Sequence, residues 1–233
     1  MAAASNPAQL TAMVERRVTG LPLEQVIGWA EFCGLRIEVD AQVFVPRHRT
    51  EFLVEQAAAL TRPGVIVVDL CCGSGAVGAA LAAQCGGIEL HATDVDPSAV
   101  RCAQRNLAAA GGHVYEGDLY EPLPAALRGR VDLLLANAPY VPSDAVELLP
   151  REARIHEPRV ALDGGADGLD VHRRIAAAAP AWLAPGGHLV IETSERQARE
   201  AVRIFTRARL VPRVARSEEL EATVVVGRRP AGR

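Results

Sequence analysis

Short, continuously apolar runs alternate along most of the chain with longer segments whose apolar residues recur every three or four positions. The run Val65–Leu70 is rich in β-branched residues, which is typical of a strand buried on both faces of a parallel sheet. Runs of the same kind predict further strands over Ile88–Thr93, His113–Glu116, Val131–Ala136 and His188–Thr193.

The segments between these strands have the spacing of amphipathic helices. The predicted helices span Glu51–Leu60, Ala76–Gln84, Ser98–Ala110, Val171–Ala181 and Glu195–Thr206. Leu210–Val214 and Ala222–Val226 have no long helix between them, so we expect them to pair as an antiparallel hairpin. The pattern predicts an α/β protein with a doubly wound, mostly parallel sheet of seven strands.

The first part of the chain has a different rhythm, and we expect residues 1–60 to form a small segment before a main domain over residues 61–233. The elements predicted there are a helix over Pro7–Arg17, a turn over Leu23–Ile27 and a β-hairpin over Ala30–Val45. Thr50 is expected to cap the helix that follows it.

Composition places the chain among globular proteins and removes several functions. With 233 residues, 49% of them hydrophobic and 23% charged, the chain can build a full core. A net charge of −3 argues against a broad electrostatic grip on nucleic acid, so no direct nucleic-acid binding is expected. No apolar run is long enough for a membrane span, and Met1–Leu10 lacks the pattern of a secretory signal. We therefore expect a cytoplasmic protein without a membrane partner.

The basic and sulfur-containing residues narrow the chemistry further. All 25 basic residues are arginine, which excludes a lysine Schiff base and a P-loop lysine. The five cysteines are odd in number and form no Cys-x-x-Cys motif, so neither a disulfide framework nor a metal site is predicted. We expect these cysteines to be small buried thiols; they are Cys33, Cys71, Cys72, Cys85 and Cys102.

Ligands of doubly wound sheets bind beyond the carboxyl ends of the strands, which directs attention to the residues that follow each predicted strand. Gly73 and Gly75 follow the first one and allow a ligand to lie against bare backbone before a helix N-terminus. With Gly78 they give only a GxGxxG-like pattern, so a dinucleotide cofactor remains an alternative. The candidate cofactor-binding residues of this turn are Asp69, Cys71, Cys72, Gly73, Ser74 and Gly75.

Carboxylates follow the next two strands. Asp94 stands where an acid accepts hydrogen bonds from the two hydroxyls of a ribose, and Asp96 is expected to cap the next helix. Asp118 is a candidate acceptor for the exocyclic amine of an adenine, and Leu119 is expected to pack on the ring. A nucleoside-containing cofactor suits all of these side chains.

The fourth strand is followed by the turn Asn137-Ala138-Pro139-Tyr140, the sharpest feature of the sequence. This turn places an amide side chain, backbone carbonyls and an aromatic ring at the same edge of the sheet as the cofactor candidates. An Asx-Pro turn of purely structural role is the alternative. Because the preceding turns face the same crevice, we interpret all four residues as candidate catalytic residues, with Asn137 also bordering the cofactor.

In this order of motifs the sequence resembles the S-adenosylmethionine-dependent class I methyltransferases, and more narrowly the HemK/PrmC family of protein N5-glutamine methyltransferases. The resemblance extends from about Arg16 to Gly227. It is carried by the partly matched segment Gly20–Gly34, by Phe44–Glu55, which reads FVPRHRTEFLVE, and by Glu157–Leu169, which reads EPRVALDGGADGL. It implies a Rossmann-like fold, S-adenosyl-L-methionine as cofactor, and methylation of a glutamine in a peptide-chain release factor.

The chain departs from the family pattern at three places. The family signature is Asn-Pro-Pro-Tyr, and Ala138 stands at the first proline. Cys71 and Cys72 stand where glycine and threonine are usual. The family also carries a helical N-terminal domain that engages the release factor, of which this chain is expected to build only a shortened part.

The resemblance implies roles for three of the four residues of the turn. The side-chain oxygen of Asn137 and the carbonyl of Ala138 accept the two N–H groups of the substrate amide, while Tyr140 packs over its plane. Around the turn, Phe44 and Pro46 are expected to close over the methionine end of the cofactor. The other predictions are that Arg47 and Glu51 lead into the cofactor site, that Glu157 and Arg159 form an ion pair behind the turn, and that His48, His156 and His172 have only surface or structural roles.

Three other functions remain open at this point. An exocyclic amine of a nucleobase poses the same chemical problem as an amide nitrogen, so an N6-adenine methyltransferase is one. An NAD-type oxidoreductase would also use the glycines and Asp94, although no Tyr-x-x-x-Lys pair can exist without lysine. A cofactor-binding module that no longer catalyses is the third, because Ala138 replaces a signature residue.

Overall fold

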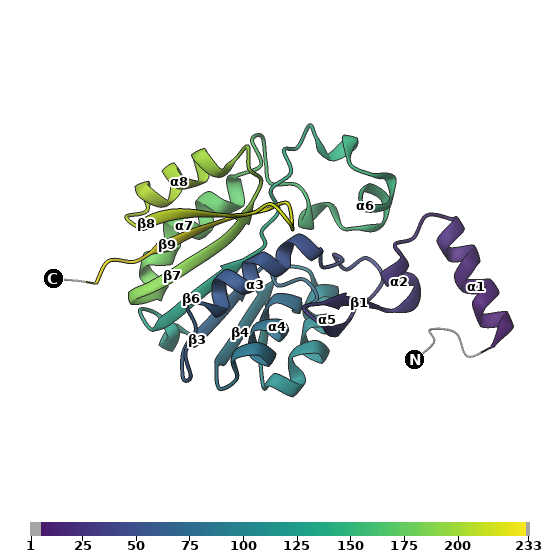
Figure 1. Cartoon of the computed structure of the whole chain (residues 1–233), viewed down its shortest axis with the longest axis horizontal. Helices are drawn as coiled ribbons and strands as arrows, with labels where there is room; N and C mark the ends of the chain where they lie inside the picture. Colours follow the sequence, from purple (N-terminus) through teal and green to yellow (C-terminus); the bar gives the residue numbers. More distant parts are fainter. Residues whose placement is uncertain (1–5, 232–233) are drawn as a thin grey trace.

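One sheet of seven strands organises the chain, with the strand order β5-β4-β3-β6-β7-β9-β8 (Figure 1). The computed structural model describes residues 6–231. The start of the segment Met1–Leu10, in which no secretory signal is predicted, lies outside the described residues. Within the described range, no helix combines the length and the apolar character that crossing a bilayer requires.

The strands confirm the predicted α/β architecture. β3 to β7 run parallel, and β9 is antiparallel to both β7 and β8, as the predicted closing hairpin requires. The strands are β3 (Ile66–Leu70), β4 (Glu89–Asp94), β5 (His113–Glu116), β6 (Val131–Ala136), β7 (Leu183–Thr193), β8 (Val211–Ser217) and β9 (Ala222–Arg228).

Helices cover both faces of this sheet (Figure 1). The helices of one face share a hydrophobic core with the sheet, and they are α3 (Glu51–Ala58), α4 (Ala76–Cys85) and α5 (Pro97–Leu107). The other face is covered by α7 (Asp170–Trp182) and α8 (Ala198–Arg207). All five match the predicted helices within a few residues.

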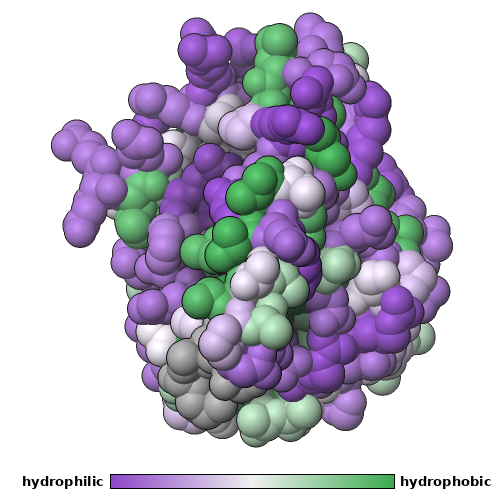
Figure 2. Space-filling view, turned by 90° about the vertical axis from the view of Figure 1, so that its right-hand side faces the viewer, coloured by the Kyte–Doolittle hydropathy of each residue, from purple (hydrophilic) through white to green (hydrophobic). Residues whose placement is uncertain are grey.

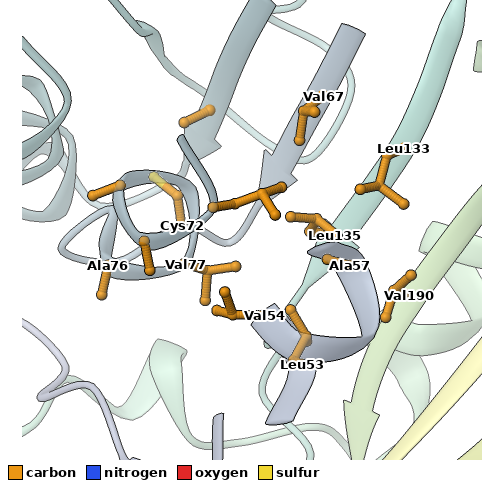
Figure 3. Close-up of a cluster of buried hydrophobic side chains, with 14 of the residues drawn as sticks. Leu53, Val54, Ala57, Val67, Cys72, Ala76, Val77, Leu133, Leu135 and Val190 are labelled. Atoms are coloured by element: carbon orange, nitrogen blue, oxygen red, sulfur yellow. The ribbon is translucent and has the colours of Figure 1, made fainter. Parts of the chain in front are cut away.

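The two cores follow from the alternation of side chains along fully buried strands. Val67 of β3 lies in the core under α3 and α4, whereas its neighbours Ile66 and Val68 lie in the core under α7 and α8. Leu135 of β6 and Val190 of β7 share the first core with Val67, and Figure 3 shows them around the apolar face of α3. Continuous apolar runs are therefore required, because both sides of each strand are covered.

The N-terminal segment lies at one side of the sheet (Figure 1). It contains α1 (Pro7–Val18), α2 (Leu23–Ile27) and a hairpin of β1 (Trp29–Phe32) and β2 (Leu35–Glu38). Several contacts at Glu38 tie the hairpin to α5. The Glu38 backbone N–H donates to Asn106 Oδ1 at 2.9 Å, and Arg105 Nε lies 2.7 Å from a Glu38 carboxylate oxygen.

Two predictions for this segment need correction. The hairpin is shorter than Ala30–Val45, because the chain leaves the sheet after Glu38 and buries Val43 and Val45 from a loop instead. Thr50 does not cap α3: its backbone is helical and its side chain makes no capping bond. Thr50 ends the short helix η1 (His48–Thr50), so its hydroxyl is available for another contact.

Several elements of the structure were not predicted from the sequence. The helix α6 (Arg151–His156) has no buried residue and therefore no apolar periodicity to reveal it. β7 begins at Leu183, five residues before the predicted strand at His188, and includes the Pro185–Gly187 turn. The other short 3₁₀ helices are η2 (Ala108–Ala110), η3 (Ala125–Leu127), η4 (Val146–Leu148) and η5 (Arg159–Ala161).

The cysteines are unpaired thiols, as expected, but they are not all buried. Cys72 and Cys102 are buried, Cys71 and Cys85 are half-buried, and Cys33 is exposed. The prediction of five buried thiols is wrong for Cys33 because it lies in the β1–β2 turn, with a left-handed backbone (φ 50°) and its side chain at the surface.

Leu135 tests the packing of the first core. It is fully buried between α3 and the sheet, so Leu135→Ala should lower the free energy of unfolding by about 2–5 kcal/mol. The measurement is urea unfolding followed by circular dichroism. Leu148→Ala removes the same atoms from a side chain that is 84% exposed, and should change stability by less than about 0.5 kcal/mol. Equal effects of the two substitutions would contradict this packing.

Candidate active site

The carboxyl ends of the central strands open into one pocket of about 1050 Å³, solvent at its mouth included. The parallel register sets Leu70 of β3 opposite both Thr93 of β4 and Ala136 of β6, so the residues that follow these strands meet. The sequence-predicted residues that line the pocket are Asp69, Cys71, Cys72, Gly73, Ser74, Asp94, Asp118, Leu119, Asn137 and Pro139. Gly75, Ala138 and Tyr140 do not line it.

The glycine-rich turn divides into two parts with different roles. Gly73 has a left-handed backbone (φ 55°), and a Cβ built there would meet no atom within 4 Å, so the turn leaves open space beside the pocket. Gly75 caps α4 with φ 78°, and a Cβ there would lie 3.2 Å from Ala103 of α5. We therefore correct the prediction for Gly75: it permits close packing of two helices.

Two acidic side chains are fixed at the floor of the pocket. Asp94 accepts hydrogen bonds from the backbone N–H groups of Gly73, at 2.8 Å, and Asp96, at 2.9 Å. Each of its oxygens retains a lone pair for a ligand hydroxyl. Asp96 caps α5 by accepting from the Ser98 N–H at 2.8 Å, as predicted. Asp69 accepts from the Gly78 N–H at 3.1 Å, and burial raises its pKa to about 7.

The third predicted acid has a partner that the sequence did not reveal. One carboxylate oxygen of Asp118 forms an ion pair with Arg174 of α7, and both residues line the pocket. Arg174 lies 56 positions away along the chain, so only the fold brings the pair together. The other oxygen of Asp118 takes no part in this pair and is available to a ligand.

The two cysteines of the pocket are held as neutral thiols. Burial raises the pKa of Cys71 and Cys72, and the nearby carboxylates of Asp94 and Asp69 raise it further. Within residues 6–231, no group of three or more histidine, cysteine and acidic side chains is placed to hold a metal ion.

Asn137 stands at the end of β6 with its carboxamide partly engaged. Its Nδ2 donates to the hydroxyl of Thr50 at 3.2 Å, whereas its Oδ1 has no partner among the described residues. Ala138 is 1% exposed, and no hydrogen bond in the described part of the chain uses its carbonyl oxygen. The turn thus has two unengaged acceptors: the oxygen of Asn137, which lines the pocket, and the carbonyl of Ala138, a buried residue that does not line it.

Tyr140 is anchored beside the pocket by polar and aromatic contacts. Its hydroxyl donates to Glu192 Oε1 at 2.9 Å, and Arg49 Nε lies 3.3 Å from the same oxygen. The edge of His172 meets its ring, at 6.5 Å between centroids. Burial lowers the pKa of His172 to about 4, so this histidine is neutral and structural, as predicted. Glu192 was not among the predicted site residues, although a single acidic residue within the apolar run of β7 could have indicated a functional side chain.

The segment Glu157–Leu169 supports the turn from the other side. The Val141 N–H donates to the Leu162 carbonyl at 3.0 Å, and the Gly164 N–H donates to the Val141 carbonyl at 2.8 Å. Gly168 has φ 76°, and a Cβ there would collide with the carbonyl oxygen of Tyr140. The glycines of this segment therefore allow backbone to pack directly on backbone behind the turn.

The predicted ion pair of this segment is wrong. Glu157 pairs with Arg47, whose guanidinium nitrogen lies 2.6 and 2.7 Å from the two carboxylate oxygens. The carboxylate of Glu157 is fully buried against the loop that carries Arg47 and also accepts from the Val45 N–H at 3.2 Å. Arg159 points to the surface and pairs with Asp163 at 3.1 Å, so it cannot reach Glu157.

The pocket suits the predicted cofactor, S-adenosyl-L-methionine. Asp94 and Asp118 present acceptors for the hydroxyl and amine groups of a nucleoside, and Phe44, Pro46 and Leu119 supply apolar walls. Asp94 and Asp118 are acidic side chains of the pocket, and they match a ligand that carries a sulfonium and an ammonium charge. Phe44 and Pro46, which are expected to close over the methionine end of the cofactor, both line the pocket. The lining residues that were not predicted as site residues include Thr50, Ala76, Val77, Val95, Ala99, Pro158, Val160, Ala161, Val171 and Arg174.

The raised pKa of Asp69 predicts a pH-dependent stability. The folded state holds this proton up to about pH 7, whereas the unfolded chain releases it near pH 4, so stability falls as pH rises between these values. Asp69→Asn keeps an acceptor for Gly78 and removes the titration. At pH 8 this variant should be more stable than the wild type by about 2–4 kcal/mol, and at pH 4 by little.

Urea unfolding at pH 4, 6 and 8 measures the difference. Asp144→Asn, at an exposed position, is the matched control and should leave the pH profile unchanged. Parallel profiles for the wild type and Asp69→Asn would contradict a protonated Asp69 in the folded pocket.

Comparisons with known proteins identify the family to which the chain belongs. The model of the methyltransferase small domain matches residues 48–165, which include the pocket turns from Asp69 to Pro139. A release factor glutamine methyltransferase of Geobacter sulfurreducens is 42% identical over 207 residues, covering 87% of this chain and 72% of the relative. That of Xylella fastidiosa is 39% identical over 239 residues, covering 98% and 84%.

Solved structures support the fold. A methyltransferase from Pyrococcus furiosus superposes with a TM-score of 0.65 at 15% identity, covering 96% of this chain and 99% of that one. A protein-(glutamine-N5) methyltransferase from Alicyclobacillus acidocaldarius gives a TM-score of 0.50 at 24% identity, covering 83% and 99%. The fold is thus the Rossmann-like class I methyltransferase fold. The similarity to the relatives from Geobacter sulfurreducens and Xylella fastidiosa shows that the chain belongs to the release factor glutamine methyltransferase family, and S-adenosyl-L-methionine is its methyl donor.

Proposed function

We propose that this chain methylates the side-chain amide nitrogen of a glutamine in a peptide-chain release factor, through the turn Asn137–Tyr140. The observation that carries this proposal is the state of the Asn137 carboxamide. Its nitrogen is engaged by Thr50 and its oxygen has no partner in the described part of the chain, so an acceptor is presented at the pocket. The substrate is proposed by analogy with the names of the relatives.

An amide nitrogen is a poor nucleophile because its lone pair is delocalised into the carbonyl. The cofactor supplies a methyl group on a sulfonium, which is a good leaving group. Positive charge develops on the amide nitrogen as it attacks, and acceptors aimed at its N–H groups stabilise that charge more than the ground state. Asn137, which lines the pocket, fits this requirement through its Oδ1, and the Ala138 carbonyl is proposed as the second acceptor.

The reaction needs no strong base, and neighbouring segments hold the turn rigid. The protonated product amide loses its proton readily, so no histidine is required, in agreement with the buried, neutral His172. Alanine at position 138 offers the same carbonyl as proline without fixing φ. The backbone bonds from Val141 to Leu162 and Gly164 hold the turn by other means. The Tyr140 ring, fixed by Glu192, provides a flat wall beside it.

The face beside the pocket suits a protein substrate. Val160 lines the pocket and is 52% exposed, and Ile155 and Leu148 expose apolar side chains on the same segment. Figure 2 shows the side of the molecule that carries α1 and α6, where hydrophobic residues lie among hydrophilic ones. Release factors work at the ribosome, so we propose a cytoplasmic location. We also propose a protein partner without direct nucleic-acid contact.

Methyl incorporation tests the proposal directly. The chain is incubated with radiolabelled S-adenosyl-L-methionine and a purified release factor, and the modified peptide is identified by mass spectrometry. We expect one methyl group on the glutamine nitrogen. Labelling of DNA instead of the release factor would favour the N6-adenine alternative. Cofactor binding without transfer to either substrate would favour a module that only binds.

Asn137→Ala should separate catalysis from cofactor binding. The variant loses one of the two acceptors, so turnover should fall by a factor of about 10²–10³. The affinity for S-adenosylhomocysteine, measured by calorimetry, should change less than about threefold, because the other pocket side chains remain. Gln56→Ala removes a carboxamide of α3 that accepts from Arg213 of β8 and does not line the pocket, so it should keep full turnover. Near wild-type turnover of Asn137→Ala would refute the assignment of this acceptor.

A further inference from the structure

We propose that Thr50 is a positioning residue for methyl transfer, holding the Asn137 carboxamide so that its oxygen stays available to the substrate. The inference rests on the proposed function of Asn137. It concerns a residue that the sequence pattern assigns to helix capping, a role that the structure does not support. Thr50 is 2% exposed and lines the pocket beside Asn137.

The contact itself carries the argument. A carboxamide has a donor end and an acceptor end, and rotation of the Asn side chain would change which atoms meet the substrate. The Thr50 hydroxyl accepts from Nδ2 at 3.2 Å and thereby occupies the donor end. Because Thr50 is buried and Asn137 half-buried, the amide plane is fixed by this bond rather than by water. The acceptor is thus oriented before the substrate arrives.

Thr50 can fix another side chain only if its own backbone is held, and two neighbouring ion pairs hold it. Arg47 pairs with the buried carboxylate of Glu157, and Arg49 pairs with the buried carboxylate of Glu192. The Thr50 N–H donates to the Arg47 carbonyl at 2.9 Å, which closes η1. Two ion pairs and one backbone hydrogen bond therefore fix η1, and with it the Thr50 hydroxyl that bonds Asn137.

Thr50→Val tests the hydroxyl because it keeps the branched shape of the side chain and removes only the polar atom. We expect kcat for methylation of the release factor to fall about tenfold or more, with little change in KM or in the affinity for S-adenosylhomocysteine. Thr50→Ser restores the hydroxyl and should recover most of kcat. Thr61→Val makes the same change just beyond α3, where the hydroxyl bonds the Ala57 carbonyl, and should leave kcat unchanged.

Two outcomes of the kinetics would overturn the inference. Unchanged kcat in Thr50→Val would show that Asn137 is oriented without the hydroxyl. A loss confined to cofactor affinity would assign Thr50 to the cofactor instead. Melting temperatures are measured for all variants, because a loss of kcat in Thr50→Ser as large as that in Thr50→Val, with an equal loss of thermal stability, would assign the effect to packing and also overturn the inference.

A readout independent of activity comes from nuclear magnetic resonance. The side-chain NH₂ signals of Asn137 are assigned by their absence in Asn137→Ala. We expect slow hydrogen exchange of these protons in the wild type and Thr50→Ser, and fast exchange in Thr50→Val. Fast exchange in the wild type would overturn the inference. If the wild type transfers no methyl group to a release factor, the proposed function fails, while the exchange data still decide whether Thr50 holds Asn137.

Discussion

The parallel register of β3 against β4 and β6 is the constraint on which the site depends. Because Leu70 pairs with both Thr93 and Ala136, the residues after three strands reach the same edge of the sheet without further adjustment. Strand order reverses around β3, so the crevice opens there. Burial on both faces makes a slip of this register costly, since each slip would move apolar side chains out of their cores.

Contacts between segments distant along the chain supply the precision that the sheet alone does not provide. The sheet brings Asn137 to the pocket and Tyr140 beside it, but Thr50, Arg49 and Glu192 hold their side chains. The backbone of residues 162–168 supports the same turn from behind. The geometry of the candidate site thus depends on several segments that lie far apart along the chain and meet at the short helix η1.

Local patterns predicted the fold and most of the pocket, because continuous apolar strands and strand-end residues are local properties. They did not predict the side-chain contacts that only the folded chain brings together. Glu157 pairs with Arg47 rather than Arg159, Arg174 reaches Asp118 from another helix, and Thr50 bonds Asn137 instead of capping α3. The polar helix α6 escaped prediction because it has no buried face. Gly75 was read as a ligand contact because helix packing and ligand binding favour the same residue.

The two thiols in the pocket wall have a consequence for the fate of the methyl group. A thiolate attacks a sulfonium carbon far more readily than a carboxamide does, so a charged cysteine here would take the methyl group from the cofactor and be alkylated in place of the substrate. Low dielectric and neighbouring negative charge keep Cys71 and Cys72 protonated, and hence poor competitors. The same buried, acidic surroundings that favour binding of a cationic methyl donor therefore keep Cys71 and Cys72 in their unreactive, protonated form.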